Sequence, residues 1–304
     1  MNGKEIYEAL CGILDRTAVL AQEPMKAHTT FRIGGPADVF VTPKSDEELA
    51  AVLAFCRKQQ IPYFVMGNGS NLLVSDAGFR GVIIQIYKTM QGCSTKGSTM
   101  QAQAGILLSS LAAEAKEHSL TGLEFASGIP GTLGGAVTMN AGAYGGEMKD
   151  VLRKVRVLDE AGQILTLDAA ELKLGYRTSL IKEKGWTVLS AELELQEGEK
   201  TAIEAQMNDL KEKRVSKQPL QYPSAGSTFK RPEGYFAGKL IQDAGLRGKQ
   251  IGGAQVSEKH CGFVINAGNA TAADVCALMK YVQDTVWEQF RVKLEQEVKF
   301  LGEF

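Results

Sequence analysis

The segment Gly128 to Gly146, GIPGTLGGAVTMNAGAYGG, contains seven glycines and no charged side chain. Each glycine inside ordered backbone costs about 0.5–1 kcal/mol relative to alanine, so another interaction must offset several kcal/mol. A flexible linker would be rich in polar residues, whereas this run carries Ile129, Leu133, Val137 and Met139. The pattern favours the close approach of a bulky, phosphorylated ligand to bare backbone.

A second glycine segment, GNGSNLL at residues 67–73, follows the apolar run 63–66, which is a predicted strand. Its glycines can expose N–H groups to an anion, and Asn68, Ser70 and Asn71 add side-chain donors. The third glycine of a dinucleotide fingerprint is missing, and there is no P-loop Lys-Ser/Thr pair. Taken alone, the segment is equally typical of a tight turn between strands. The two segments together indicate a cradle for a large cofactor that carries phosphates.

Composition excludes several other classes of protein. A chain of 304 residues is long enough for two domains. Its 34 Lys+Arg against 35 Asp+Glu give no overall field that would attract nucleic acid or an anionic membrane. Five scattered cysteines show no metal-binding spacing and suit a reducing compartment. Neither a signal peptide nor a membrane span is evident, so we expect a cytoplasmic protein.

Hydrophobic periodicity and capping residues predict a mixture of helices and strands. Helices are expected at 45–56, 107–118, 201–217, 237–244 and 271–286, with capping boxes at Ser45, Thr201 and Thr271. Strands are expected at 63–66, 82–86, 100–104, 186–195 and 292–300, with a hairpin formed by 154–158 and 164–167. This order predicts an α+β or α/β fold in more than one domain, with a boundary near 196–220.

Several motifs resemble one family in particular. They are TTFRIGGPAD (29–38), GNGSNLLVSDAGF (67–79), SGIPGTLGGAVTMNAGAYGGEM (127–148), GYRTS (175–179), AGSTFKRP (225–232), GKQIGGAQVSEKHCGFVIN (248–266) and LEQEVKF (294–300). In this order they resemble the UDP-N-acetylenolpyruvoylglucosamine reductases, flavoenzymes of the vanillyl-alcohol-oxidase-type FAD-binding superfamily. The resemblance covers essentially the whole chain.

The resemblance implies an α+β fold with a two-subdomain α/β FAD-binding unit at 1–200, divided into about 1–85 and 86–200. A C-terminal α+β substrate domain would occupy 201–304, and its last strand could return to the FAD region. FAD would be bound noncovalently, with NADPH as reductant. The expected FAD contacts are Gly67, Asn68, Gly69, Ser70, Asn71, Leu72, Gly128, Gly131, Thr132, Gly134, Gly135, Ala136, Asn140, Ala141 and Gly142. The short stretch between Arg177 and the 201–217 helix resembles the smaller, type II branch.

The implied reaction belongs to peptidoglycan precursor synthesis. NADPH reduces FAD, and flavin N5 then delivers hydride to C3 of UDP-N-acetylglucosamine enolpyruvate. A proton at C2 completes UDP-N-acetylmuramate. By motif matching, Arg177 would hold the substrate carboxylate, Ser227 would donate the proton, and Glu297 would help to polarise the enolate.

Local pattern alone leaves other interpretations open for these three residues. By local pattern Arg177 is more typical of a surface arginine, and Ser227 of a turn or helix-cap serine, than of catalytic residues. Glu297 cannot be distinguished from Glu295, because both lie on the polar face of the predicted strand. The alternative functions are an FAD oxidase of the same superfamily, reoxidised by oxygen, and a flavin- or nucleotide-binding module without catalysis.

The substrate diphosphate requires basic residues. The family pattern selects Lys217, and Lys230 and Arg231 lie near Ser227 in the sequence. Arg231 stands where other members carry asparagine, and Arg214 is a further candidate. Tyr144 is expected to cover part of the substrate. No metal, nucleic acid or membrane partner is expected.

Overall fold

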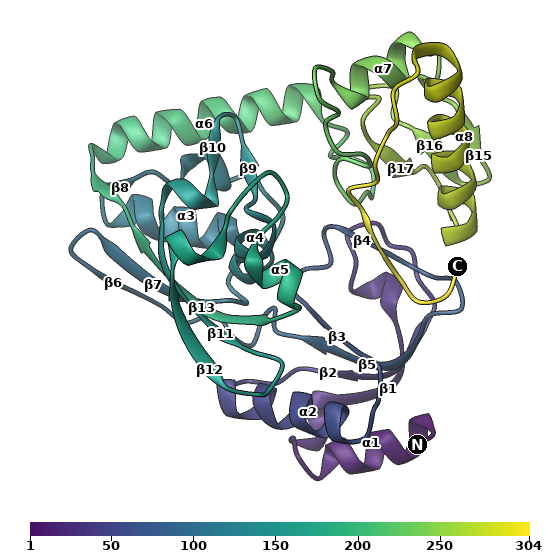
Figure 1. Cartoon of the computed structure of the whole chain (residues 1–304). Helices are drawn as coiled ribbons and strands as arrows, with labels where there is room; N and C mark the ends of the chain where they lie inside the picture. The colour runs from purple at the N-terminus through teal and green to yellow at the C-terminus, as the bar shows by residue number, and fades with distance from the viewer. The chain divides into compact units, whose positions relative to one another are not determined.

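The computed structural model describes all 304 residues, which form two compact units (Figure 1). Unit 1 comprises Met1–Leu20, Val39–Asn68 and Val82–Arg214, and unit 2 comprises Ala21–Asp38, Gly69–Gly81 and Val215–Phe304. The predicted division at residue 200 stays a prediction. The compact units divide the chain at Arg214 and assign two earlier segments to unit 2.

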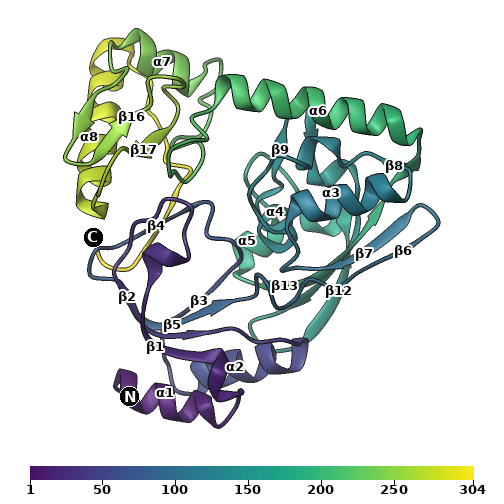
Figure 2. The same ribbon diagram turned by 180° about the vertical axis from the view of Figure 1, so that it is seen from behind.

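A four-stranded sheet has the order β1 (Val19–Pro24), β2 (Pro36–Val41), β5 (Phe79–Gln85) and β3 (Tyr63–Met66). Strands β3 and β5 pair in parallel. Because parallel strands cannot be joined by a tight turn, the chain between them makes a long crossover connection. In both views the helices α1 (Gly3–Cys11) and α2 (Asp46–Lys58) lie along one side of this sheet (Figures 1 and 2). Ser45 caps α2, and the predicted apolar stripe from Leu49 to Cys56 is buried, which confirms this helix.

The second sheet of unit 1 is antiparallel, with the order β12 (Ile164–Asp168), β11 (Leu152–Leu158), β13 (Thr187–Glu194), β7 (Thr99–Gln103) and β6 (Cys93–Lys96). The predicted hairpin is confirmed as β11 and β12. Strand β13 lies at the centre, and its first five residues are all buried because both of its faces are covered.

Three helices accompany this sheet: α3 (Leu108–Glu117), α4 (Leu133–Met139) and α5 (Leu180–Lys184). The predicted helix at 107–118 is confirmed as α3. Helix α4 was not expected, because its sequence LGGAVTM has two glycines in the first turn. It packs against β13, so tertiary contacts stabilise a helix that propensity disfavours. Two short pairs complete the unit: β8 (Leu120–Thr121) with β14 (Gln196–Glu197), and β9 (Gly142–Ala143) with β10 (Gly146–Glu147).

Helix α6 (Lys200–Lys217) is largely exposed, and Ile203 is its one buried residue. The predicted capping box at Thr201 is wrong, because the helix already begins at Lys200. The N–H groups of Ala202 and Ile203 donate instead to the Glu199 carbonyl (2.9 and 3.0 Å).

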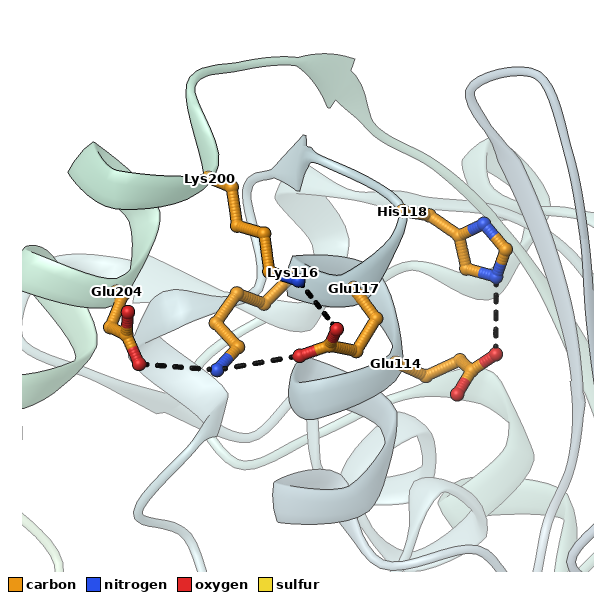
Figure 3. A network of polar contacts seen from close by, with 6 residues as sticks. All are labelled: Glu114, Lys116, Glu117, His118, Lys200 and Glu204. Carbon is orange, nitrogen blue, oxygen red and sulfur yellow. Dashed lines mark hydrogen bonds and ion pairs between the residues drawn. The ribbon is translucent and has the colours of Figure 1, made fainter.

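Ion pairs tie the first turns of α6 to the end of α3 (Figure 3). Lys116 Nζ lies 3.4 Å from Glu204, and Lys200 Nζ lies 2.5 Å from Glu117. These contacts are exposed, so each contributes little by itself. Together they fix the start of a helix that buries almost no apolar surface.

Unit 2 contains the antiparallel sheet β15 (Gln250–Ile251), β16 (Ala254–Val256) and β17 (Val264–Asn266), with α7 (Ala237–Asp243) and α8 (Ala272–Phe290) beside it (Figures 1 and 2). The predicted capping box of α8 is confirmed, and so is its buried stripe of Val275, Leu278, Met279, Val282 and Val286.

The carboxylate of Asp274 supports the start of α8. It accepts hydrogen bonds from the N–H groups of Thr271 (3.0 Å) and Gly253 (3.1 Å), which lower its pKa. Asp76 accepts two further N–H groups at the same end, from Ala272 (2.8 Å) and Ala273 (3.0 Å). The loop that contains Asp76 is thereby attached to α8.

The predicted terminal strand at 292–300 is wrong over most of its length. Strand β18 covers only Lys299–Leu301 and pairs in parallel with β4 (Leu72–Val74). Leu294 and Val298 are nevertheless buried, so apolar alternation here reflects packing of irregular chain on the core of unit 2.

Candidate functional site

The first two residues of the segment 67–73 contact the glycine run 128–146 within unit 1. Asn68 Nδ2 donates to the Pro130 carbonyl (2.7 Å), and Gly67 faces the side chain of Thr132, which is buried. Gln85 Nε2 holds the Gly67 carbonyl at 3.2 Å. The sequence prediction that these segments act together is consistent with this arrangement.

Several of these glycines are required by contacts inside the protein. A Cβ on Gly67 would overlap Thr132 Oγ1, and one on Gly134 would lie 2.9 Å from the Cβ of Ala104. A Cβ on Gly142 would lie 2.7 Å from the Gly146 carbonyl oxygen. The expectation that side chains here would collide with a cofactor therefore needs correction for these three positions, where the protein itself fills the space.

Gly135 is different. It is exposed, and the nearest atom to a Cβ placed on it is Thr132 Oγ1 at 3.9 Å. Nothing in the protein prevents a side chain at this position. The predicted FAD contact of Gly135 would account for glycine at this position, and it stays a prediction.

Asn140 ends α4 in the left-handed conformation (φ +46°) and is 1% exposed. Its Nδ2 donates to Glu147 Oε2 (2.7 Å) and to the Gly175 carbonyl (3.2 Å), and its Oδ1 accepts from Lys149 N (2.9 Å). All three bonds are internal to the protein. The predicted FAD contact of Asn140 stays a prediction, and its visible role is to join the glycine run to the turn at Gly175.

That turn carries Arg177. Gly175 and Thr178 pair across it, and Arg177 adopts a left-handed conformation (φ +56°). The guanidinium lies 5.1 Å from the centre of the Tyr176 ring, and Lys182 Nζ donates to the Arg177 carbonyl (3.0 Å). The backbone of Arg177 is therefore fixed at the tip of a short turn, with its side chain half-buried.

The backbone segments that contain Ser227 and Glu297 lie next to each other in unit 2, although the two residues are 70 positions apart in the sequence. The Glu297 N–H donates to the carbonyl of Thr228 (2.9 Å), the neighbour of Ser227. Phe229 and Gln296 form a bridge beside this bond. Ser227 is exposed, and its hydroxyl makes no hydrogen bond within the protein.

The structure separates the two glutamates that the sequence could not distinguish. Glu295 Oε2 pairs with Lys230 Nζ at 3.0 Å on the surface, and this contact lowers the pKa of Glu295. Glu297 is half-buried and hydrogen-bonded next to Ser227. The two glutamates therefore differ in their surroundings, and the catalytic role of Glu297 stays a prediction.

The predicted basic residues differ in their surroundings. Lys217 is exposed at the end of α6 and forms no ion pair, whereas Lys230 is engaged by Glu295. Arg231 lies over Phe236, with its Cζ 4.0 Å from the ring centre, and its Nε donates to the Tyr235 carbonyl (3.3 Å).

Tyr144 lies in the glycine run of unit 1, and Arg214 of α6 lies beside its first residue, Gly128. A Cβ on Gly128 would lie 3.0 Å from Arg214 Cδ, and burial lowers the pKa of Arg214. No carboxylate pairs with this guanidinium, so a fixed positive charge lies next to Gly128. Tyr144 is 44% exposed at the tip of the β9–β10 turn (φ +53°).

The remaining features that could form a site are possible metal ligands, the cysteines, membrane-spanning helices and a further cavity. No group of three or more His, Cys, Asp or Glu side chains has the geometry to hold a metal ion, and all five cysteines are free thiols. No helix combines the length and apolar character that crossing a bilayer would need. A cavity of about 320 Å³ in unit 2 is lined by Gln221, Tyr222, Gln255, Ser257, Glu258, Lys259 and Ile265, none of which is a predicted site residue.

Comparison with known proteins identifies the cofactor-binding part of the chain, and that part includes both glycine segments. Residues 37–168 match the FAD binding domain family, and residues 218–301 match the C-terminal domain of UDP-N-acetylenolpyruvoylglucosamine reductase. The fold is therefore an FAD-binding domain followed by a reductase C-terminal domain, which confirms the predicted fold class. The chain is an FAD-dependent oxidoreductase.

The particular family follows from full-length relatives. The chain is 52% identical over 303 residues to the UDP-N-acetylenolpyruvoylglucosamine reductases of Alkaliphilus oremlandii and Clostridioides difficile, covering 100% of each chain in both cases. The crystal structure of the reductase from Thermus caldophilus is similar, with a TM-score of 0.80, 38% identity, and coverage of 93% of this chain and 98% of that one. The chain belongs to the UDP-N-acetylenolpyruvoylglucosamine reductase family.

Proposed function

We propose that this protein reduces UDP-N-acetylglucosamine enolpyruvate to UDP-N-acetylmuramate, with NADPH as the electron source, in peptidoglycan precursor synthesis. The full-length relationship to the reductases supports the overall activity. The observation that supports the residue assignments is the hydrogen bond between Glu297 N and Thr228 O, because it joins the backbone of the predicted polarising residue to the neighbour of Ser227, the predicted proton donor.

The residues of unit 1 are compatible with a bound FAD. Gly67 and Asn68 lie against Pro130 and Thr132, and Gly135 offers open backbone nearby. Arg214 adds an unpaired positive charge next to Gly128, which suits an anionic group. When bound, FAD supplies the hydride that is taken from NADPH and passed to the substrate.

The protein must then stabilise the negative charge that develops on the substrate and supply a proton to C2. Hydride addition at C3 of the enol ether leaves negative charge toward C2 and the adjacent carboxylate. Arg177 would bind that carboxylate through its planar guanidinium, and the left-handed turn fixes its backbone for this purpose. Ser227 would donate the proton to C2, and its exposed hydroxyl has no competing partner within the protein. Glu297 would help to polarise the enolate.

The diphosphate of the substrate would be bound by Lys217, Lys230 and Arg231, and Tyr144 would cover part of the substrate. Lys217 is the most available of the three bases, since Lys230 is paired and Arg231 lies on an aromatic ring. We also assign the chain to the type II branch. Between the turn at Arg177 and α6 it contains only α5, β13 and β14, with no further inserted element.

Anaerobic stopped-flow spectroscopy at the flavin band tests this function. The purified protein is reduced with NADPH, and UDP-N-acetylglucosamine enolpyruvate is then added. We expect rapid return of the oxidised spectrum only with this substrate. Failure with the substrate, combined with fast reoxidation by air, would refute the reductase assignment in favour of an oxidase.

A further inference from the structure

We propose that Asn71, in the first glycine segment, positions the backbone of Glu297. Its Nδ2 donates to the Glu297 carbonyl at 3.1 Å, and its own carbonyl accepts from Lys299 N at 2.9 Å. One asparagine therefore holds the chain on both sides of Val298. This inference rests on the proposed function of Glu297.

The local structure explains why Glu297 needs such support. Residues 291–298 belong to no helix or strand, so no regular ladder fixes their conformation. Glu297 is instead held at both of its backbone polar groups, the N–H by the Thr228 carbonyl (2.9 Å) and the C=O by Asn71. A side chain emerging from backbone fixed at both groups has a defined direction.

Thr228, which accepts the hydrogen bond from the Glu297 N–H, is itself held by two hydrogen bonds. Thr228 is 3% exposed, its N–H donates to the Gly262 carbonyl (2.9 Å), and its Oγ1 accepts from Val264 N (2.8 Å). Strand β4 begins directly after Asn71 and pairs with β18, which follows Glu297. Asn71 thus joins the glycine segment to the chain on both sides of Val298, through its side-chain amide at Glu297 and its backbone carbonyl at Lys299.

Removing the amide should displace Glu297 while leaving the loop backbone available to the cofactor. A displacement of about 1 Å at a reacting group can slow a reaction on the order of 100-fold. Because Glu297 acts only on the enolpyruvyl substrate, flavin reduction by NADPH should change far less. Asn71 is therefore expected to affect mainly one half-reaction.

The test compares Asn71→Ala, Asn71→Asp, Glu297→Gln and the double variant Asn71→Ala/Glu297→Gln as purified flavoproteins. Asn71→Asp keeps the size of the side chain but cannot donate to the carbonyl, so it serves if the alanine variant folds poorly. The matched control is Asn266→Ala. It removes another asparagine of unit 2 whose Nδ2 donates to a backbone carbonyl, that of Phe31 (3.3 Å).

With FAD held at a saturating concentration, we expect the Asn71 variants to slow flavin reoxidation by substrate roughly 10–100-fold and to slow NADPH-driven reduction far less. The double variant should be no slower than Glu297→Gln alone, because coupled residues are not additive. Asn266→Ala should lower the unfolding temperature without slowing reoxidation.

Two results would overturn the inference. Equal losses in both half-reactions, or weaker FAD binding by the same factor, would mean that Asn71 acts on the cofactor. Multiplicative effects of the Asn71 and Glu297 substitutions would mean that the two residues act independently. Failure of the proposed function itself is distinguishable, because the unsubstituted protein would then not be reoxidised by the substrate.

Discussion

Alanine substitution at two adjacent glycines of α4 should have opposite effects on the FAD-free protein. At Gly134 the new Cβ would lie 2.9 Å from the Cβ of Ala104. This distance is about 0.6 Å shorter than ~3.5 Å, the lower end of the optimal separation between two carbon atoms. Relief by movement is restricted, because the Gly134 N–H is bonded to the Ala104 carbonyl (2.8 Å). Overpacking of this kind typically costs about 1–3 kcal/mol of unfolding free energy.

At Gly135 the nearest atom lies 3.9 Å away, so the methyl group would make an ordinary van der Waals contact and no clash. Alanine there should stabilise the FAD-free protein by up to about 0.5–1 kcal/mol, since the unfolded chain loses conformational freedom. If the cofactor touches Gly135, the same substitution should weaken FAD binding, and the stability gain should disappear or reverse when FAD is present.

Urea unfolding of the FAD-free variants and titration with FAD, followed by flavin fluorescence, measure both effects. A Gly134→Ala protein as stable as the original would refute the packing explanation. A Gly135→Ala protein with unchanged FAD affinity would refute the proposal that the cofactor approaches this position.

Four further outcomes follow from the assigned roles. Ser227→Ala should leave NADPH-driven flavin reduction intact and slow reoxidation by substrate about 10²–10⁴-fold, and an equal loss in both steps would contradict its role as proton donor. Arg177→Lys should lower turnover about 100-fold or more, because an ammonium cannot grip both carboxylate oxygens; near-normal turnover would exclude the clamp. Glu297→Gln should slow reoxidation strongly, whereas Glu295→Gln should change it little, and the reverse order would show that the wrong glutamate was chosen. The capping bonds lower the pKa of Asp274 from its ordinary 3.8, so its contribution to stability is present above that pH and is lost as the pH falls through the lower folded-state pKa. Urea midpoints between pH 7 and pH 3 should therefore fall less steeply for Asp274→Asn than for the original protein; identical curves would contradict this.

Most of the regular elements and the class of cofactor could be predicted from the sequence alone. The capping residues Ser45 and Thr271 and the apolar stripes behind them predicted α2 and α8, because caps and 3.6-residue periodicity act within a few residues of chain. The glycine segments predicted a phosphate-bearing cofactor, since composition alone shows where side chains are absent. Motif order then identified the family.

Tertiary structure decided what local pattern could not. Helix α4 forms despite its glycines because it packs on β13, and the terminal segment fails to form a long strand because only Lys299–Leu301 finds a partner. The different surroundings of Glu295 and Glu297 depend on Lys230 and Thr228, which lie 65 or more residues away in the sequence.

The glycines themselves show the same division. The sequence shows how many glycines there are, but it does not show which contact requires glycine at each position. Gly134 is required by Ala104 and Gly67 by Thr132, whereas Gly135 is open to a ligand. Likewise, Asn71 resembles a simple loop donor in the sequence and holds the carbonyl of Glu297 in the structure. Such roles depend on contacts between segments that are distant in the chain, and the fold alone brings those segments together.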